Sequence, residues 1–292
     1  MLRSMYSAVS GMRGFQTKLD VIGNNIANVN TVGFKKSRVM FQDVLSQNLA
    51  GATAPNPTDP RRGGVNPRQV GLGVQIGAID TLHTPGSPMT TGVLTDLAIA
   101  GDGFFLVVPP GMDPNDGNYY LTRAGNFTLD AEGQLVTSDG YLVLGFDVDD
   151  DGNAINSPIS IRIDPDADFV AYDITRNGNV IGYLEDGTSE VIAVIALGLV
   201  NNPGGLRKIG GSLYEMTANA HPDGALVWGQ NLGTIDSLGV TAEIISGMLE
   251  MSNVDLTEEF TEMIVAQRGF QANSRIITTS DEILQEVVNL KR

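Results

Sequence analysis

The sequence predicts an α+β protein with several parts. Long helices at the two chain ends pair as a coiled coil, and they flank a central antiparallel β-rich domain of barrel or sandwich type. Apolar residues near the N-terminus recur at alternating intervals of four and three, and apolar residues near the C-terminus recur every seven. Short β-prone runs separated by turn signals fill the middle. With 292 residues and 42% hydrophobic content, the chain can build at least one core.

Residues 1–40 are predicted to form the N-terminal helix of an inner coiled-coil domain. A 4-3 repeat keeps one apolar stripe facing a partner helix, and Gly33 is expected to end the helix as a left-handed cap. The stripe consists of Met1, Met5, Ala8, Met12, Phe15, Leu19, Ile22, Ile26 and Val29.

The same helix has a face that is polar but almost uncharged. Asn24, Asn25 and Asn28 lie on it within the segment LDVIGNNIANVNTVGFKKSR. Because an amide both donates and accepts, it can satisfy close neighbours without the desolvation cost of an ion. We therefore expect other copies of the protein to cover this helix, or the helix to line a narrow polar channel.

The middle of the chain divides into a linker and a β domain. Residues 41–75 contain GATAPNPTDPRRGGVNPRQVGLG and are predicted to be an extended Pro/Gly-rich linker. Residues 76–235 are predicted to form a β-rich outer domain, with a candidate sub-domain at 146–190. Strand-like runs such as GFFLVV, YLVLGF and EVIAVIALGL alternate with hairpin turns such as Asn177-Gly178 and Asp186-Gly187.

Residues 236–292 are predicted to contain the C-terminal helix of the inner domain. Asp255 followed by Glu258 resembles a capping box at its start. A seven-residue ladder comprises Leu249, Leu256, Met263, Phe270, Ile277 and Leu284, and the stripe is widened by Phe260, Ile264, Val287 and Val288. Two long helices at opposite chain ends most simply pair with each other.

These patterns predict a set of residues that make contacts between helices or between subunits. The set comprises Met5, Met12, Phe15, Leu19, Ile22, Asn24, Asn25, Ile26, Asn28, Val29, Leu256, Phe260, Met263, Phe270, Ile277 and Leu284.

The composition argues against several classes of function. A net charge of -16 disfavours nucleic acid and anionic membranes, and no apolar run is long enough for membrane insertion. There is no cysteine, phosphate loop, dinucleotide motif or nucleophile turn, so we expect no enzyme, catalytic residue or cofactor. His83 and His221 are interpreted as surface or turn residues. The start of the chain lacks the features of a cleavable secretory signal, so export would need another route.

One acidic segment partly matches a calcium loop. Asp147, Asp149 and Asp151 have the spacing of its first half, but Pro158 occupies the twelfth position, where a bidentate Glu is required. An acidic hairpin tip is the favoured interpretation, and these three residues are weak candidates for a metal site.

Both ends of the chain resemble a known family. LDVIGNNIANVNTVGFKKSR and SNVDLTEEFTEMIVAQRGFQANSRIITTSDEILQEVVNL resemble the N- and C-terminal signatures of bacterial flagellar hook and basal-body rod proteins. The segments DLAIAGDGFFLV and LTRAGNFTLDAEGQLVTSDGYLVLG resemble β segments of the family, so the likeness covers most of the chain apart from roughly 146–190.

The resemblance implies a helical homopolymer around a central channel, with inner helices and an outer β wall. It also implies export through the flagellar type III apparatus to the bacterial flagellum, outside the cell. The implied partners are further copies of the chain and other rod, hook, junction and cap proteins, with no cofactor.

Within the family, the two ends resemble short hook proteins of the Gram-positive type. This favours a hook subunit, which forms a flexible tubular universal joint that transmits motor torque to the filament. The alternative is the distal rod, or drive shaft, because the Pro-rich segment after Phe41 resembles that of straight rods and 292 residues is short for a hook. A carbohydrate-binding β module with a helical stalk is a remote alternative.

Overall fold

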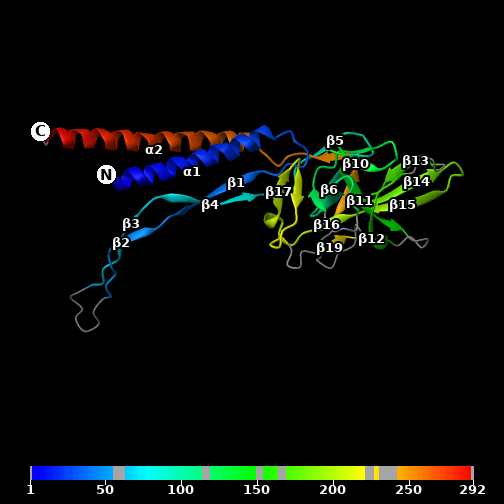
Figure 1. Cartoon of the computed structure of the whole chain (residues 1–292), viewed down its shortest axis with the longest axis horizontal. Helices are drawn as coiled ribbons and strands as arrows, with labels where there is room; N and C mark the ends of the chain where they lie inside the picture. Colours follow the sequence, from blue (N-terminus) through cyan, green and yellow to red (C-terminus); the bar gives the residue numbers. More distant parts are fainter. Residues whose placement is uncertain are drawn as a thin grey trace. The chain divides into compact units, whose positions relative to one another are not determined.

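The chain divides into two compact units (Figure 1). The computed structural model describes residues 2–54, 63–113, 119–148, 154–163, 169–220, 227–229 and 242–290. The first unit, called the terminal unit here, comprises Met1–Ala27, Ser37–Thr81 and Asp255–Arg292. The second, called the β unit, comprises Asn28–Lys36 and Leu82–Val254. Helices at both chain ends and a central antiparallel β-rich region confirm the coarse architecture that the sequence predicts.

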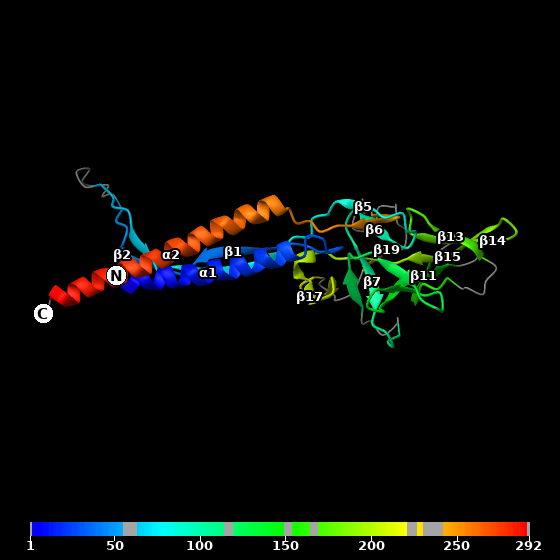
Figure 2. The same cartoon turned by 90° about the horizontal axis from the view of Figure 1, so that it is seen from above.

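Two helices, α1 (Leu2–Ala27) and α2 (Leu256–Leu290), lie side by side in the terminal unit (Figure 2). They run antiparallel, because Gly11 of α1 faces Asn273 whereas Phe15, further along α1, faces Gly269. The start of α2 is capped by Asp255, whose Oδ1 accepts the Thr257 N–H at 2.8 Å. Such a cap satisfies a backbone donor that the first turn of a helix leaves unpaired.

Helix α1 ends well before the predicted cap at Gly33. Beyond Ala27 the chain forms turns, and the Thr31 N–H donates to the Asn28 carbonyl at 3.1 Å. Asn28 and Val29 are therefore not helical, which corrects the prediction. Asparagine competes for local backbone hydrogen bonds and so favours such turns. Gly33 does have positive φ (66°), but here it permits close approach to the Ala124 backbone nitrogen, 2.5 Å from where a Cβ would lie.

The described part of the predicted linker forms an antiparallel β ribbon. Strand β1 (Ser37–Asp43) pairs with β4 (Val74–Thr81), and β2 (Ser46–Ala50) pairs with β3 (Arg68–Gly71). The ribbon packs on α1, where the Phe41 ring lies 5.8 Å from the Phe15 ring. The sequence predicted a linker because the Pro-rich segment dominates its composition and makes the alternating side chains of the flanking strands hard to recognise. Residues 55–62 lie outside the described part.

The β unit is built on a 13-stranded antiparallel network. Its longest path runs β13-β14-β15-β11-β7-β8-β18-β17, and β10, β9, β12, β16 and β19 branch from it. The strands of the network are β7 (Phe104–Val108), β8 (Tyr120–Thr122), β9 (Phe127–Leu129), β10 (Leu135–Thr137), β11 (Leu142–Val148), β12 (Ala154–Ser160), β13 (Phe169–Ile174), β14 (Asn179–Leu184), β15 (Ser189–Ile195), β16 (Leu197–Leu199), β17 (Arg207–Gly210), β18 (Leu213–Glu215) and β19 (Val227–Gly229).

Two smaller strand pairs and one turn of 3-10 helix complete the described part of this unit. Strand β6 (Leu97–Ala100) pairs with β20 (Glu243–Ser246), and β5 (Pro88–Thr90) pairs with β21 (Met248–Glu250). The 3-10 turn is η2 (Pro203–Gly205). The predicted hairpin turns at Gly178 and Gly187 are confirmed, with φ of 78° and 77°.

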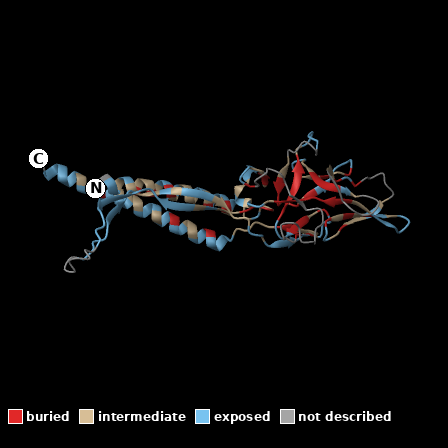
Figure 3. Ribbon diagram, turned by 90° about the horizontal axis from the view of Figure 1, so that it is seen from below, coloured by how far each residue is buried: buried red, intermediate tan, exposed pale blue. Residues whose placement is uncertain are grey.

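Strand β7 is buried on both faces. Phe105 and Val107 belong to one apolar cluster, whereas Phe104, Leu106 and Val108 belong to another. Successive side chains of a strand point to opposite faces, so a continuous apolar run indicates burial on both sides. Figure 3 shows that the buried residues concentrate in the strands of this unit.

The predicted C-terminal helical segment begins too early. Leu249, the first residue of the predicted ladder, lies in β21 opposite Met89 and is buried in the β unit. Helix α2 starts only at Leu256, after the Asp255 cap. Leu249 and Leu256 therefore belong to a strand and a helix, and the seven residues between them are not a helical repeat.

Candidate functional site

The line of α2 that is buried is made of small and polar residues. Glu259, Ala266 and Ser280 are its buried residues, and half-buried Asn273 completes a seven-residue repeat with them. Among the predicted ladder residues on α2, Met263, Ile277 and Leu284 are half-buried, whereas Leu256, Phe260 and Phe270 are exposed. The predicted ladder residues on α2 are therefore less buried than this line, and the expected pairing of the two apolar stripes stays a prediction.

On α1 the structure separates the predicted contact residues into three groups. Ile22 and Asn25 are buried, and Asn24 is exposed. The others on the helix are half-buried: Met5, Met12, Phe15, Leu19 and Ile26. Asn28 and Val29 are half-buried in the turns that follow and belong to the β unit.

Glycines lie at two places where α1 and α2 face each other. A Cβ on Gly11 would lie 2.7 Å from the Asn273 side chain, and a Cβ on Gly269 would lie 2.6 Å from the Phe15 ring. Contacts this short do not occur between real Cβ atoms and their neighbours, so a Cβ at either place would displace the side chain that faces it. Lys18 and Glu262 add an ion pair at the edge of the contact.

Asn25 connects α1, α2 and the β ribbon. Its Nδ2 donates to the Ser37 carbonyl at 2.9 Å and to Glu259 Oε2 at 3.1 Å, while its Oδ1 accepts the Ser37 N–H at 3.0 Å. The side chain is 1% exposed. An amide is suited to this place because it pairs with both groups of a strand backbone at once.

The terminal unit exposes many large apolar side chains, which we call the exposed apolar surface. They are Tyr6 on α1; Leu256, Phe260, Ile264, Val265, Phe270, Ile276, Ile283, Val287, Val288 and Leu290 on α2; and Met40, Phe41, Val44, Leu45, Leu49, Val65, Val70, Leu72 and Ile79 on the ribbon. All residues of β2 and β3 are exposed. A two-stranded ribbon alone is marginal in water, and an apolar surface this large marks an interaction site.

A cluster of buried ions joins distant segments of the β unit. Lys35 Nζ donates to Glu250 Oε1 at 2.6 Å and to the Thr84 carbonyl at 2.7 Å. Arg123 Nη1 lies 3.4 Å from Glu250 Oε2, and the Gly86 N–H donates to Glu250 Oε1 at 2.9 Å. Desolvation lowers the pKa of Lys35, and the hydrogen bond from Lys35 to Glu250 opposes that shift.

Sequence reasoning missed this ion cluster. Its members are separated by up to 215 residues, and no motif known to us links them. The one local signal is that Lys35 directly follows buried Phe34 and Gly33, so its burial could have been suspected.

His83 is not the surface residue that the sequence suggested. Its ring centroid lies 5.7 Å from that of Phe104 and 5.4 Å from that of Tyr214. Burial, with the nearby charges of Lys35, Arg123 and Lys208, lowers the pKa of His83 to about 4. Burial raises the pKa of Tyr214 to about 12. His221 lies outside the described residues.

The calcium candidates gain no support. Asp147 is an exposed residue of β11, and its Oδ1 accepts the Val148 N–H at 2.9 Å. Asp149 and Asp151 lie outside the described residues, and the described part of the chain contains no group of acidic or histidine side chains suited to a metal ion. In the same part of the chain, neither helix is long and apolar enough to cross a membrane.

Three family models match this chain. Residues 5–35 match "Flagella basal body rod protein", residues 98–182 match "Flagellar hook protein FlgE/F/G D1 domain", and residues 245–290 match "Flagellar basal body rod FlgEFG protein C-terminal". The matched regions include α1, β7 and α2, which are the elements described above.

Full-length relatives carry the same names. The chain is 51% identical to the flagellar basal-body rod protein FlgG of Bacillus subtilis (strain 168), over 292 residues that cover all of both chains. It is 38% identical over 294 residues to the FlgG protein of Borreliella burgdorferi, again covering all of both chains. It is 29% identical over 459 residues to the flagellar hook protein FlgE of the same organism, with full coverage of both. The chain therefore belongs to the flagellar hook and basal-body rod protein family and is a structural component of the bacterial flagellum.

Proposed function

We propose that the chain is the subunit of the distal rod, the drive shaft of the flagellar basal body, and that it has no enzymatic activity. The rod relative at 51% identity is far more similar than the hook relative at 29%. The sequence favoured the hook on the resemblance of the chain ends, and these comparisons support the rod better.

Chain length is the observation that carries the proposal. Alignments with the two rod proteins run over 292 and 294 residues, whereas the alignment with the hook protein runs over 459. The hook protein therefore has long segments without a counterpart in this chain, and the rod proteins do not.

The β ribbon supports a rigid assembly. A flexible linker would let the terminal unit adjust during each turn of a bent joint, whereas paired strands resist such change. The ribbon also exposes Leu45 (64%) and Leu49 (60%), which a neighbouring subunit would cover. Burial of such side chains stabilises an interface by about 25 cal/mol per Å² of apolar area.

Assembly follows from the exposed apolar surface. Copies stack helically through heterologous contacts, in which one patch of each subunit fits a different patch on the next. The terminal helices form the inner wall as coiled coils, with the flanking ladder residues of α2 contacting other copies. The β unit forms the outer wall as a sandwich-like domain, which its two buried clusters support. Partners are the adjoining rod, hook, junction and cap proteins and the type III export apparatus.

Electron microscopy of basal bodies from a strain lacking this chain tests the proposal. We expect basal bodies that end before the distal rod, with hook and filament absent, and we expect the wild-type chain to restore them. Complete rods that lack only the hook would show that the chain is a hook subunit instead.

Complementation provides a second, independent test. Expressed in Bacillus subtilis strains, the chain should restore motility to a mutant lacking FlgG and not to a mutant lacking the hook protein. The converse result would also assign the chain to the hook.

A further inference from the structure

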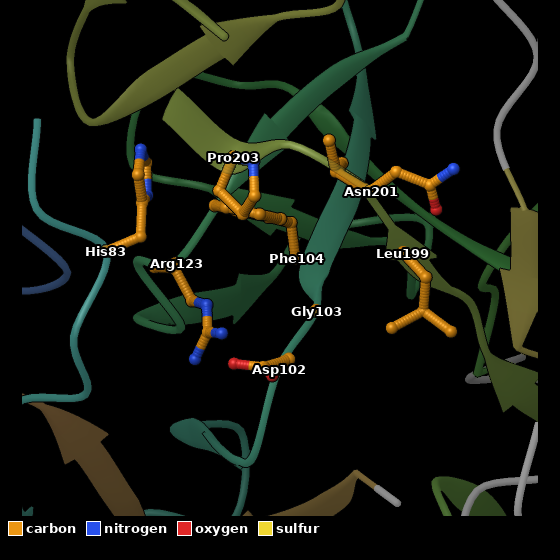
Figure 4. A pocket seen from close by; sticks show the side chains of 9 residues that line it. His83, Asp102, Gly103, Phe104, Arg123, Leu199, Asn201 and Pro203 are labelled. Carbon is orange, nitrogen blue, oxygen red and sulfur yellow. The ribbon is translucent and has the colours of Figure 1, made fainter. Parts of the chain in front are cut away.

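A pocket of about 310 Å³ opens in the β unit beside the buried ion cluster (Figure 4). Its lining includes Asp102, Phe104, Arg123, Leu199 and Asn201. Figure 4 shows the guanidinium of Arg123 and the carboxylate of Asp102 pointing toward one another across this space. The pocket is therefore lined by both apolar and charged side chains.

Two residues that line the pocket, and Tyr214 beside them, each have a buried polar atom without a hydrogen-bond partner within the described part of the chain. These atoms are His83 Nδ1, Arg123 Nε and the Tyr214 hydroxyl. Arg123 is 4% exposed, so water reaches it poorly. A buried donor without an acceptor costs about 1–3 kcal/mol, more when it is charged, and such groups are therefore rare in folded proteins. Their clustering at one pocket indicates a site for an additional group.

The charge of the cluster indicates what kind of group fits. Lys35 and Arg123 are cationic and, within the described part of the chain, Glu250 is the anion that pairs with both, so this trio retains an excess positive charge. Arg123 Nη1 faces Glu250 and Nη2 donates to the Gly101 carbonyl at 2.9 Å, which leaves the buried Nε without an acceptor; a carboxylate reaches Nε only when the lining side chains move aside. A carboxylate would satisfy Nε and neutralise the excess charge together.

We propose that this pocket receives a carboxylate side chain from a second copy of the chain. The inference rests on the proposed assembly, because only a polymer places another copy beside the β unit. Each copy carries 34 acidic against 18 basic residues, so carboxylates dominate the surface that a neighbour presents. Charge complementarity of this kind fixes the register of an interface more than its affinity. The contact would hold neighbouring β units in one register along the rod.

Acetate is the probe for the carboxylate chemistry. The Nε–H resonance of Arg123 is followed by nuclear magnetic resonance in the full-length chain, below the concentration at which it assembles, and is assigned with Arg123→Lys. We expect a progressive, saturating shift with acetate and none with chloride at the same ionic strength. An Nε–H resonance that responds equally to both salts, or to neither, overturns the proposal.

A variant at Asp102 tests whether the anion that pairs with Arg123 comes from another copy or from Asp102 itself. It lies exposed at the pocket, where its negative charge opposes a second anion. If the proposal holds, Asp102→Asn tightens acetate binding several-fold. If Asp102 itself serves as the counterion of Arg123, the same change lowers the stability of the fold and acetate restores it, and this result overturns the proposal.

Blocking the pocket tests the source of the carboxylate. Asn201→Trp fills its exposed rim, and Thr188→Trp places the same side chain at the exposed turn between β14 and β15 as a control. We expect Asn201→Trp alone to abolish the acetate response and to raise the concentration needed for polymerisation about tenfold or more. Loss of the acetate response with unchanged polymerisation overturns the assignment to a second copy. Failure of the wild-type chain to polymerise would instead count against the proposed function.

Discussion

At the scale of single residues, Glu250 organises the region where three segments of the β unit meet. Its two carboxylate oxygens face Lys35 and Arg123, and one of them also accepts the Gly86 N–H. All three charged side chains are at most 4% exposed. Removing one member of such a group leaves buried charges without a partner, which costs far more than losing a surface ion pair.

Glu250→Gln should lower the free energy of unfolding by about 3–5 kcal/mol, because Lys35 and Arg123 would remain buried without an anion. Urea denaturation followed by near-ultraviolet circular dichroism measures this. The matched control is Glu215→Gln, which breaks the exposed pair with Arg207 and should cost less than about 1 kcal/mol. Equal losses of unfolding free energy in the two variants would show that the buried cluster stabilises the fold no more than an exposed ion pair does.

His83 should make stability depend on pH. Its pKa is about 4 in the fold and about 6.5 when unfolded, so the unfolded chain binds the extra proton between these values. The contribution is fully present above pH 6.5 and is lost as the pH falls toward 4. Since the ring is partly exposed, we expect a loss of about 1–2 kcal/mol. His83→Gln should lack this component of the pH profile; identical profiles for the variant and the wild type would contradict the expectation.

At the scale of elements, close contact between α1 and α2 depends on small residues. Gly11 and Gly269 lie where a Cβ would meet the opposite helix, whereas no atom lies within 4 Å of a Cβ on Gly23. The larger apolar residues flank this line and remain available to other copies. If the proposed assembly holds, the helix pair is one part of a larger bundle, and the buried line of α2 consists of small and polar groups.

Two glycine substitutions separate helix propensity from packing. Gly23→Ala should stabilise the helical signal by about 0.5–1 kcal/mol, because alanine favours the helix and has free space. Gly269→Ala gains the same propensity but must displace the Phe15 ring, so its net effect should be neutral or destabilising. Thermal unfolding followed by far-ultraviolet circular dichroism compares them, and equal stabilisation by both would disprove the close approach.

Ile22→Asp should block polymerisation while the β unit stays folded. Ile22 is a buried apolar residue of α1, and an aspartate there would be a buried charge without a partner. Gln16→Asp adds the same charge at an exposed position of α1 and should polymerise normally. Sedimentation measures polymer, and near-ultraviolet circular dichroism reports on the β unit. Normal rods made from the Ile22→Asp chain would refute the role of this helix.

At the scale of the whole molecule, the two units differ in how they bury apolar surface. The β unit has two clusters of buried residues on opposite faces of β7, whereas the terminal unit exposes long rows of apolar side chains. A unit of the second kind completes its core only when other copies cover it. Folding of the chain ends and assembly of the polymer should therefore be coupled.

Amide hydrogen exchange should reveal this coupling. In dilute monomer we expect α1, α2 and the β ribbon to exchange within seconds to minutes, and β7 and β11 to remain protected for hours. In the polymer, exchange in the terminal unit should slow by about a hundredfold or more. Strong protection of α2 in dilute monomer would contradict the coupling and would indicate a terminal unit that is complete by itself.

Several features of the protein follow from local chemistry along the chain. The existence of both terminal helices, the Asp255 cap, the β7 strand and the turns at Gly178 and Gly187 follow from periodicity and from backbone preferences within a few residues. The family likewise followed from the two terminal motifs, and the comparisons confirm it.

Which side chains contact each other depends on the tertiary structure. Apolar periodicity points to the Met263 ladder, yet the contact line of α2 contains Glu259 and Asn273, because glycines and amides allow helices to approach more closely than large side chains do. The ion cluster of Lys35 and Glu250 likewise depends on the folding together of residues far apart in the chain. Such contacts depend on the energy of the whole fold, and no local pattern in a single sequence shows which distant residues will meet.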